Sequence, residues 1–69
     1  MAVTYKKLWI LLIEKGLNKT ELKDLSKITT STLARLGKNE VVSMGALQRI
    51  CQVLECNIGD IVDYVPDER

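Results

Sequence analysis

The residues best suited to a chemical role lie in one stretch, TTSTLARLGKNE, at positions 29–40. At 100° per residue, Leu33 and Leu36 fall on one side of a helix through this stretch. The opposite side carries Thr30, Ser31, Ala34, Arg35 and Lys38. A face exposed only for solubility would favour Glu and Lys, which form helices better than Thr and Ser. We therefore expect a helix over about residues 29–37 whose outer face meets another molecule at close range.

Each side chain on this outer face has a way to contact duplex DNA. Ser and Thr hydroxyls can donate to or accept from base edges, and an alanine can touch a thymine methyl. Arg35 can form a bidentate pair with guanine, which is worth about 1–3 kcal/mol of discrimination, whereas the alternative is a surface arginine that pairs with Glu40 or with nothing. Thr29 is expected to cap the helix, which leaves the next two hydroxyls available. The residues expected to read bases are Thr30, Ser31, Ala34 and Arg35.

Residues around this helix suit the DNA backbone. Lys38 and Asn39 follow the helix directly, where phosphate contact is expected rather than base reading. Two further helices are expected to begin nearby, and their first N–H groups can bind phosphate oxygens. These groups lie at Asn18, Lys19 and Thr20 and at Ser43, Met44 and Gly45. For the two lysines, an ordinary solvated side chain is an equal alternative.

Five helices, and no strand, are expected to position these residues. The chain has dense helix punctuation and no run of alternating polar and apolar residues. The expected N-caps are Asn18 with Glu21, Thr29, Ser43, and Asn57 with Asp60, and the expected C-terminal glycines are Gly16 and Gly37. The expected helices run from about Tyr5 to Lys15, Asn18 to Ser26, Thr29 to Leu36, Ser43 to Leu54, and Asn57 to the residue before Pro66.

A periodic apolar stripe on each expected helix predicts the core. The residues expected to face inward are Tyr5, Leu8, Trp9, Leu12 and Ile13 on the first helix, Leu22 and Leu25 on the second, Leu33 and Leu36 on the third, Leu47, Ile50, Cys51 and Leu54 on the fourth, and Ile58, Ile61 and Val62 on the fifth. Ile10 falls outside the stripe of the first helix.

The composition is that of one small globular domain. The chain has 69 residues, is 46% hydrophobic and 28% charged, and shows no linker or repeat, so residues 1–69 are expected to form a single domain. Its longest apolar run, LWILLI at 8–13, is too short to cross a bilayer, and a cytoplasmic protein without membrane contact is expected.

The charge is distributed unevenly along the chain. Residues 1–40 carry eight basic and four acidic side chains, a net charge of +4, whereas residues 41–69 carry two basic and five acidic side chains, a net charge of −3. This polarity suits a polyanion at one end, although a solvated charge pattern is the commoner explanation.

The sequence gives little support to catalytic or metal chemistry. It has no His for acid–base work, no Gly-rich phosphate loop and no carboxylate pair in an evident pocket, so an enzyme is not expected. Cys51 and Cys56 fall short of a four-ligand zinc set, and on one helix they would lie about 7.5 Å apart along the axis, too far for a disulfide. We expect them to act as small hydrophobes, with no cofactor, no metal and no small-molecule substrate.

The stretch NKTELKDLSKITTSTLARLGKNE, followed by VSMGALQRICQVLECNIGDIV, resembles the Cro/C1-type helix-turn-helix repressors, in particular their compact five-helix, single-domain versions. The resemblance covers nearly the whole chain and implies an all-α, lambda-repressor-like fold whose third helix reads DNA. The residues it implicates are Thr30, Ser31 and Arg35 for bases, and Lys19, Lys38, Asn39 and the start of the helix at Ser43 for phosphates. Lys23 stands where the family usually has a small residue. Lys27 stands where it commonly has glycine, the residue that best tolerates a positive φ.

Together these observations predict a sequence-specific DNA-binding transcriptional regulator of the repressor type. A homodimer is expected, because one short helix offers few base contacts and two half-sites about one helical turn apart increase the affinity. The sequence leaves its interface open between Ile10 with Ile13 and the acidic C-terminal segment after Asn57. The alternative function is a protein-interaction module, such as an antitoxin or a scaffold, built on the same fold.

Overall fold

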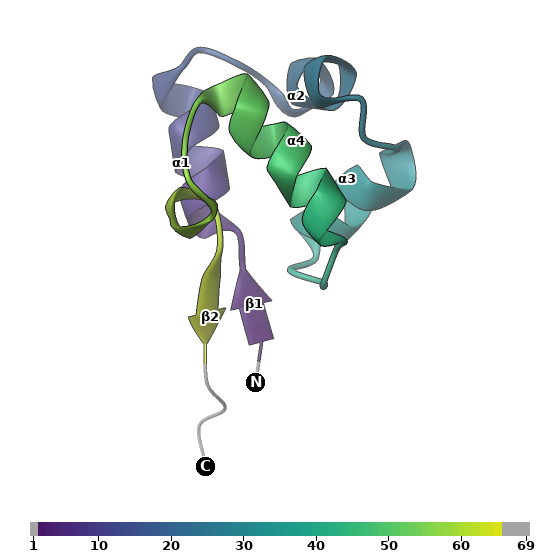
Figure 1. Cartoon of the computed structure of the whole chain (residues 1–69), viewed down its shortest axis with the longest axis vertical. Helices are drawn as coiled ribbons and strands as arrows, with labels where there is room; N and C mark the ends of the chain where they lie inside the picture. Colours follow the sequence, from purple (N-terminus) through teal and green to yellow (C-terminus); the bar gives the residue numbers. More distant parts are fainter. Residues whose placement is uncertain (1, 66–69) are drawn as a thin grey trace.

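The fold is a small helical body with a short β-ribbon at one end (Figure 1). The computed structural model describes residues 2–65 of the chain. Its elements in chain order are β1 (Ala2–Thr4), α1 (Lys6–Glu14), α2 (Lys19–Ser26), α3 (Thr30–Gly37), α4 (Met44–Leu54), the 3-10 turn η1 (Ile58–Asp60) and β2 (Asp63–Val65). The described part of the chain is therefore mostly helical, with four α-helices, and α2 packs against both α3 and α4.

The β-ribbon corrects the expectation of a chain without strands. β1 pairs with β2 in antiparallel register, with Ala2 opposite Val65, Val3 opposite Tyr64, and Thr4 opposite Asp63. Each strand has only three residues, which is too short to show the alternation by which a strand is recognised in a sequence. The ribbon brings the two ends of the described chain together (Figure 1).

The expected fifth helix is also corrected, because residues 58–60 form a single 3-10 turn. The backbone N–H of Asn57 donates to Asp60 Oδ2 at 3.0 Å, so the expected pairing of these two residues is present. Ile61 is fully buried directly after the turn, and the chain then continues as β2. Pro66, expected to end this helix, lies outside the described residues.

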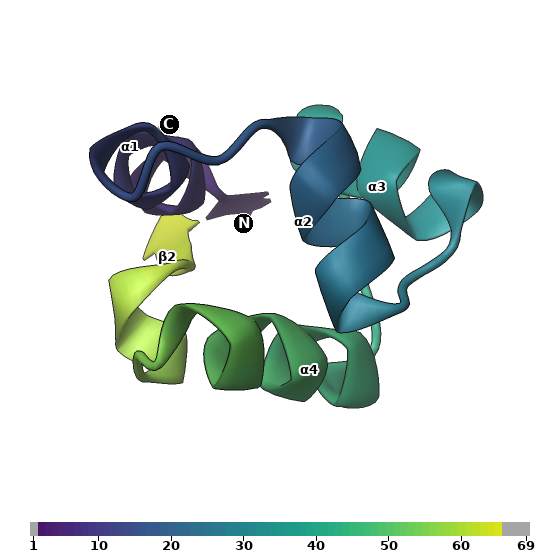
Figure 2. The ribbon, with the colours of Figure 1, turned by 90° about the horizontal axis from the view of Figure 1, so that it is seen from above.

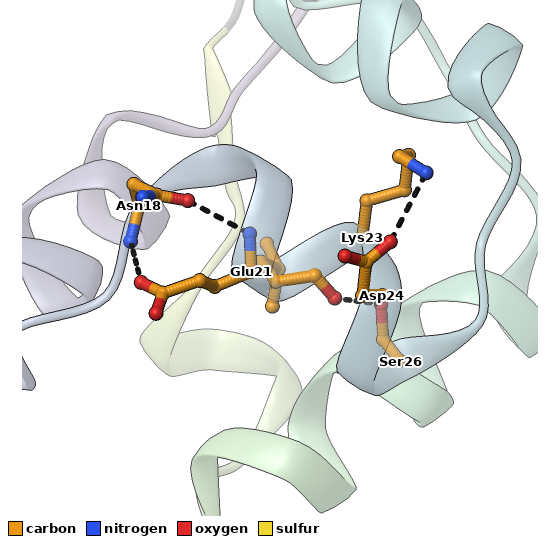
Figure 3. Close-up of polar contacts among 6 residues, drawn as sticks. Asn18, Glu21, Lys23, Asp24 and Ser26 are labelled. Carbon is orange, nitrogen blue, oxygen red and sulfur yellow. Dashed lines mark hydrogen bonds and ion pairs between the residues drawn. The ribbon is translucent and has the colours of Figure 1, made fainter.

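The expected N-caps of α2, α3 and α4 are confirmed. At α2 the Asn18 Oδ1 accepts from the N–H of Glu21 at 2.8 Å, and Glu21 Oε1 accepts from the N–H of Asn18 at 2.9 Å, which is a capping box (Figure 3). The remaining two caps are Thr29, which accepts from the N–H of Thr32 at 3.1 Å, and Ser43, which accepts from the N–H of Ala46 at 3.1 Å. These bonds fix where α2, α3 and α4 begin.

The helix ends follow the sequence less closely. Gly16 has a φ of +71° directly after α1, as expected of a C-terminal glycine. Gly37, in contrast, lies inside the last turn of α3, and Asn39 two residues later takes the left-handed conformation with a φ of 57°. Lys27 ends α2 with a φ of 59°, so the chain adopts the usual left-handed turn without glycine.

The core is built from one face of each helix. The buried apolar residues are Tyr5, Leu8, Leu12, Leu22, Ile28, Leu36, Ala46, Leu47, Ile50, Leu54 and Ile61. Trp9, Leu33, Cys51, Ile58 and Val62, which were expected to be inward-facing, are partly buried and pack against this core. The helical periodicity of the sequence therefore predicted most of the core.

Two expected core residues are exposed. Leu25 is 56% exposed because the buried line of α2 runs through Leu22 and Ser26, one turn apart, and Ser26 donates its hydroxyl to the carbonyl of Leu22 at 2.6 Å (Figure 3). Ile13 is 77% exposed because the buried line of α1 runs through Leu8 and Leu12. In both helices the exposed residue is adjacent in the sequence to a buried one, so it points about 100° away from the inner face of the helix.

Candidate nucleic-acid interface

The outer face of α3 brings together the four side chains predicted to read bases. Thr30, Ser31, Ala34 and Arg35 are all exposed, whereas Leu36 on the opposite side is fully buried and Leu33 is partly buried. α3 lies at one side of the molecule, and α1 lies at the other (Figures 1 and 2). The predicted reading face is thus a continuous exposed surface on a helix at the edge of the fold.

These side chains are not engaged elsewhere in the described part of the chain. Thr29 is the residue that caps α3, and its hydroxyl also donates to Thr32 Oγ1 at 3.0 Å. Among residues 2–65, the side chains of Thr30, Ser31 and Arg35 make no hydrogen bond or ion pair. The ion pair between Arg35 and Glu40, one form of the alternative expected for that arginine, is therefore not formed, and Arg35 is an exposed side chain without a partner among these residues. Their donors and acceptors remain available to a ligand.

The start of α2 offers a second group of polar contacts beside α3. The capping box satisfies the N–H groups of Asn18 and Glu21, which leaves the N–H groups of Lys19 and Thr20 without an acceptor inside the helix. Both lie where the helix dipole favours an anion. The Lys19 ammonium lies over the ring of Trp9, 4.6 Å from the ring centroid. Asn18 has a structural role here, because its side-chain oxygen is used by the cap.

The loop between α3 and α4 is anchored by a residue that the sequence did not single out for this role. The backbone N–H of Tyr5 donates to Asn39 Oδ1 at 3.1 Å, and the Tyr5 hydroxyl donates to the carbonyl of Glu40 at 2.8 Å. Burial raises the pKa of Tyr5, so this phenol stays protonated and keeps its donor at physiological pH. Asn39, predicted to contact phosphate, uses its side-chain oxygen to hold the loop, while Lys38 beside it is exposed.

The start of α4 faces the same side of the molecule as α3 (Figure 2). Ser43 uses its hydroxyl to cap the helix, and the next two N–H groups, those of Met44 and Gly45, have no acceptor inside it. Among the predicted phosphate contacts, Asn18, Asn39 and Ser43 therefore shape the backbone through their side-chain oxygens. Lys19, Thr20 and Lys38 are exposed beside it.

Two of the basic side chains form ion pairs within residues 2–65. Lys7 pairs with Asp63 at 3.1 Å, and Lys23 pairs with Asp24 at 3.2 Å (Figure 3). Within residues 2–65, no ion pair involves Lys19, Arg35 or Lys38, and the same holds for Lys6, Lys15, Lys27 and Arg49. The charges of Arg35 and Lys38 are thus available to a polyanion at α3, although unpaired cations also lie elsewhere on the described chain.

The two thiols pack against the core. Cys51 and Cys56 are free, and both are partly buried and pack against the core. Burial, and then the neighbouring Cys56, raise the pKa of the Cys51 thiol to about 11, so it stays un-ionised. In the described part of the chain no group of His, Cys, Asp and Glu side chains could hold a metal ion. No helix there is long and apolar enough to cross a membrane.

Comparison with known proteins agrees with this geometry. Residues 7–67 match the family of Cro/C1-type HTH DNA-binding domains. The chain is 36% identical over 61 residues to the uncharacterized HTH-type transcriptional regulator YozG of Bacillus subtilis (strain 168). The aligned region covers 86% of this chain and 73% of YozG. It is also similar to the crystal structure of the transcriptional regulator VanUg, Form II, with a TM-score of 0.92, 45% identity, and coverage of 96% of this chain and 88% of that one. The chain therefore belongs to the Cro/C1-type helix-turn-helix DNA-binding domains and is a DNA-binding transcriptional regulator rather than an enzyme.

Proposed function

We propose that this protein acts as a repressor that recognises a specific operator by placing α3 in the major groove of DNA. The observation that carries the proposal is the exposed face of α3, on which the side chains of Thr30, Ser31 and Arg35 make no hydrogen bond or ion pair with the rest of residues 2–65. A bound protein of this kind blocks a promoter by occupying it, and this mode of action requires no cofactor.

The side chains on α3 divide the reading of bases between them. Arg35 forms a bidentate pair with guanine and provides about 1–3 kcal/mol of discrimination against other bases. Ala34 contacts a thymine methyl, and the hydroxyls of Thr30 and Ser31 bond to base edges or to the adjacent phosphates. Because all but Arg35 are short, the backbone of α3 can approach the floor of the groove closely.

The phosphate contacts fix the position of α3 in the groove. We assign them to the ammonium groups of Lys19 and Lys38, to the N–H groups of Thr20 and of the residues that follow Ser43 at the start of α4, and to the side-chain NH2 groups of Asn18 and Asn39, whose side-chain oxygens are already bonded. These contacts carry no sequence information, but they set the register in which the reading face meets the bases.

We further propose that the whole chain, residues 1–69, works as one domain in the cytoplasm and binds its operator as a homodimer. Two half-sites one helical turn apart, about 34–36 Å, place two copies of α3 in successive major grooves on one side of the duplex. Ile10 and Ile13 on α1 and Tyr64 and Val65 on β2 are exposed apolar residues. α1 lies on the side of the molecule away from α3, so contact between two copies there leaves both reading faces open (Figures 1 and 2).

Binding-site selection from randomised duplexes tests this function. The expected result is a consensus of two related half-sites in inverted orientation, about 10 base pairs apart from centre to centre. Recovery of tightly bound duplexes with no common sequence would show that α3 does not read bases. A protein that shifts no duplex at low salt, but co-purifies with one stoichiometric protein partner, would be an interaction module instead.

A further inference from the structure

Lys19 has an unusual neighbour for the first residue of a helix. Its ammonium lies over the face of Trp9, 4.6 Å from the ring centroid, although the two residues belong to different helices. Trp9 is itself held in place, because it is partly buried and packs against the core. The ring therefore provides a fixed platform that restricts where the flexible lysine side chain can go.

The chemistry of this platform matters for the charge that Lys19 carries. A carboxylate partner would neutralise the ammonium, and Lys19 forms no ion pair within residues 2–65. An aromatic face attracts a cation through its quadrupole and leaves the net charge unchanged. Trp9 thus orders the ammonium but keeps its full charge available to an anion.

Lys19 is also the first residue of α2, at the helix end that favours an anion. The capping box between Asn18 and Glu21 consumes two of the first N–H groups and leaves those of Lys19 and Thr20 free inside the helix. A positive charge at a helix N-terminus is unfavourable by itself, because the dipole there is also positive. A phosphate bound at this end would relieve that repulsion and would meet two N–H donors together with the ammonium.

We propose that Trp9 is a positioning residue that holds the Lys19 ammonium ready for a phosphate of the DNA backbone at the start of α2. This rests on the proposed function, and it adds a role for a residue on α1, outside the helix-turn-helix. The gain comes from ordering the lysine before binding, which lowers the entropy lost when the phosphate contact forms. The predicted contribution is small and independent of sequence.

A double-mutant cycle tests this role. The probe is a duplex pool of random sequence, about 30 base pairs long, at about 50 mM salt, because a phosphate contact does not require the operator. Trp9→Leu should weaken binding by about two- to five-fold, within the entropy cost of immobilising one long side chain, and Trp9→Phe should restore part of it because a smaller aromatic face remains. In the Lys19→Gln background, Trp9→Leu should have no further effect. Lys19→Gln alone should lower the salt slope of binding by about 0.9 for each subunit that contacts the duplex, or about 1.8 for the dimer.

The outcomes separate this inference from the function on which it rests. Equal weakening by Trp9→Leu in both backgrounds would assign Trp9 a purely structural role and overturn the inference, while the DNA-binding function would stand. An unchanged salt slope in Lys19→Gln would show that Lys19 makes no phosphate contact, and this would overturn the inference. If the unmodified protein binds no duplex under these conditions, the proposed function and the inference both fail. Circular dichroism checks that each variant is folded at the temperature used.

Discussion

Arg35 is the residue from which most of the sequence preference should come. It is exposed on α3 and makes no ion pair within the described chain, so its guanidinium is free to form the bidentate pair with guanine. Arg35→Ala should weaken binding to the selected operator by about 1–3 kcal/mol for each half-site, or about 2–6 kcal/mol for the dimer, and relax the preference at one base pair in each half-site. Competition between the operator and duplexes altered at single positions measures both effects.

Lys38→Ala is the matched control for Arg35→Ala, since Lys38 is an exposed cation just beyond α3. Its loss should weaken binding about equally for all duplexes and reduce the salt slope by about 0.9 for each subunit, or about 1.8 for the dimer. If Arg35→Ala behaves in this same uniform way, then Arg35 contacts phosphate and another residue on α3 reads the bases.

At the scale of single residues, the sequence predicted exposure best where a helix has two clearly different faces. Leu36 is buried, and the four expected base readers are exposed, because leucines and short polar residues alternate on α3 with helical period. Leu25 and Ile13 were placed wrongly because each neighbours the true inner face, and periodicity alone does not locate that face to within one residue. The bonds from Tyr5 to Asn39 and Glu40 join residues more than 30 positions apart, for which the sequence gives no local signal.

Among the helices, the junction between α2 and α3 stores backbone strain that can be measured. Lys27 has a φ of 59°, a conformation that costs a non-glycine residue about 1 kcal/mol or more. Lys27→Gly should relieve this strain, although the more flexible unfolded chain offsets part of the gain. The expected net stabilisation is about 0.5–1 kcal/mol, seen as a rise in Tm of roughly 2–8 °C in thermal unfolding.

Lys27→Ala serves as the control, because it removes the same charge and side chain but keeps a Cβ at a positive φ. It should leave the Tm unchanged or slightly lower. An equal rise in both variants would mean that the lysine side chain, and not the backbone conformation, is the source of the strain.

The starts of the helices were easier to predict than their ends. Asn18, Thr29 and Ser43 accept the bonds expected of N-caps, since a capping side chain acts within three residues of its own position. The ends of α2 and α3 rely on Lys27 and Asn39 in left-handed conformations, where no glycine marks the turn. Asn tolerates this conformation, so Asn39 could have been recognised as a helix-end signal, whereas a lysine such as Lys27 gives no such signal.

At the scale of the whole molecule, the sequence predicted the helical body but not the β-ribbon that joins the two ends of the described chain. The ribbon of β1 and β2 joins residues about 60 positions apart through three residue pairs, and neither strand is long enough to be recognised alone. The terminal segment after Asn57 was therefore expected to be helical, although it forms only η1 before it returns to β1 as a strand. Long-range pairing of short segments is the part of the fold that local patterns leave undetermined.

The exposed apolar surface of α1 is where two copies of the chain are expected to meet. Ile10 and Ile13 are 47% and 77% exposed, and each borders a shallow hollow, of about 270 and 300 Å³ respectively, that an isoleucine from a second copy could enter. The double variant Ile10→Lys with Ile13→Lys should shift the protein from dimer to monomer in sedimentation equilibrium. It should also weaken binding to the two-half-site operator far more than binding to a single half-site, because the two copies no longer share one binding event.

Leu25→Lys is the control for this variant, since Leu25 is a comparably exposed apolar residue on α2. It should leave the sedimentation of the dimer unchanged. Dissociation caused by Tyr64→Lys and not by the α1 variant would move the interface to the β-ribbon, which is the second exposed apolar surface away from α3. An unmodified protein that stays monomeric both alone and on its operator would contradict the homodimer, because each α3 would then read its half-site independently and the inverted repeat would have no physical cause.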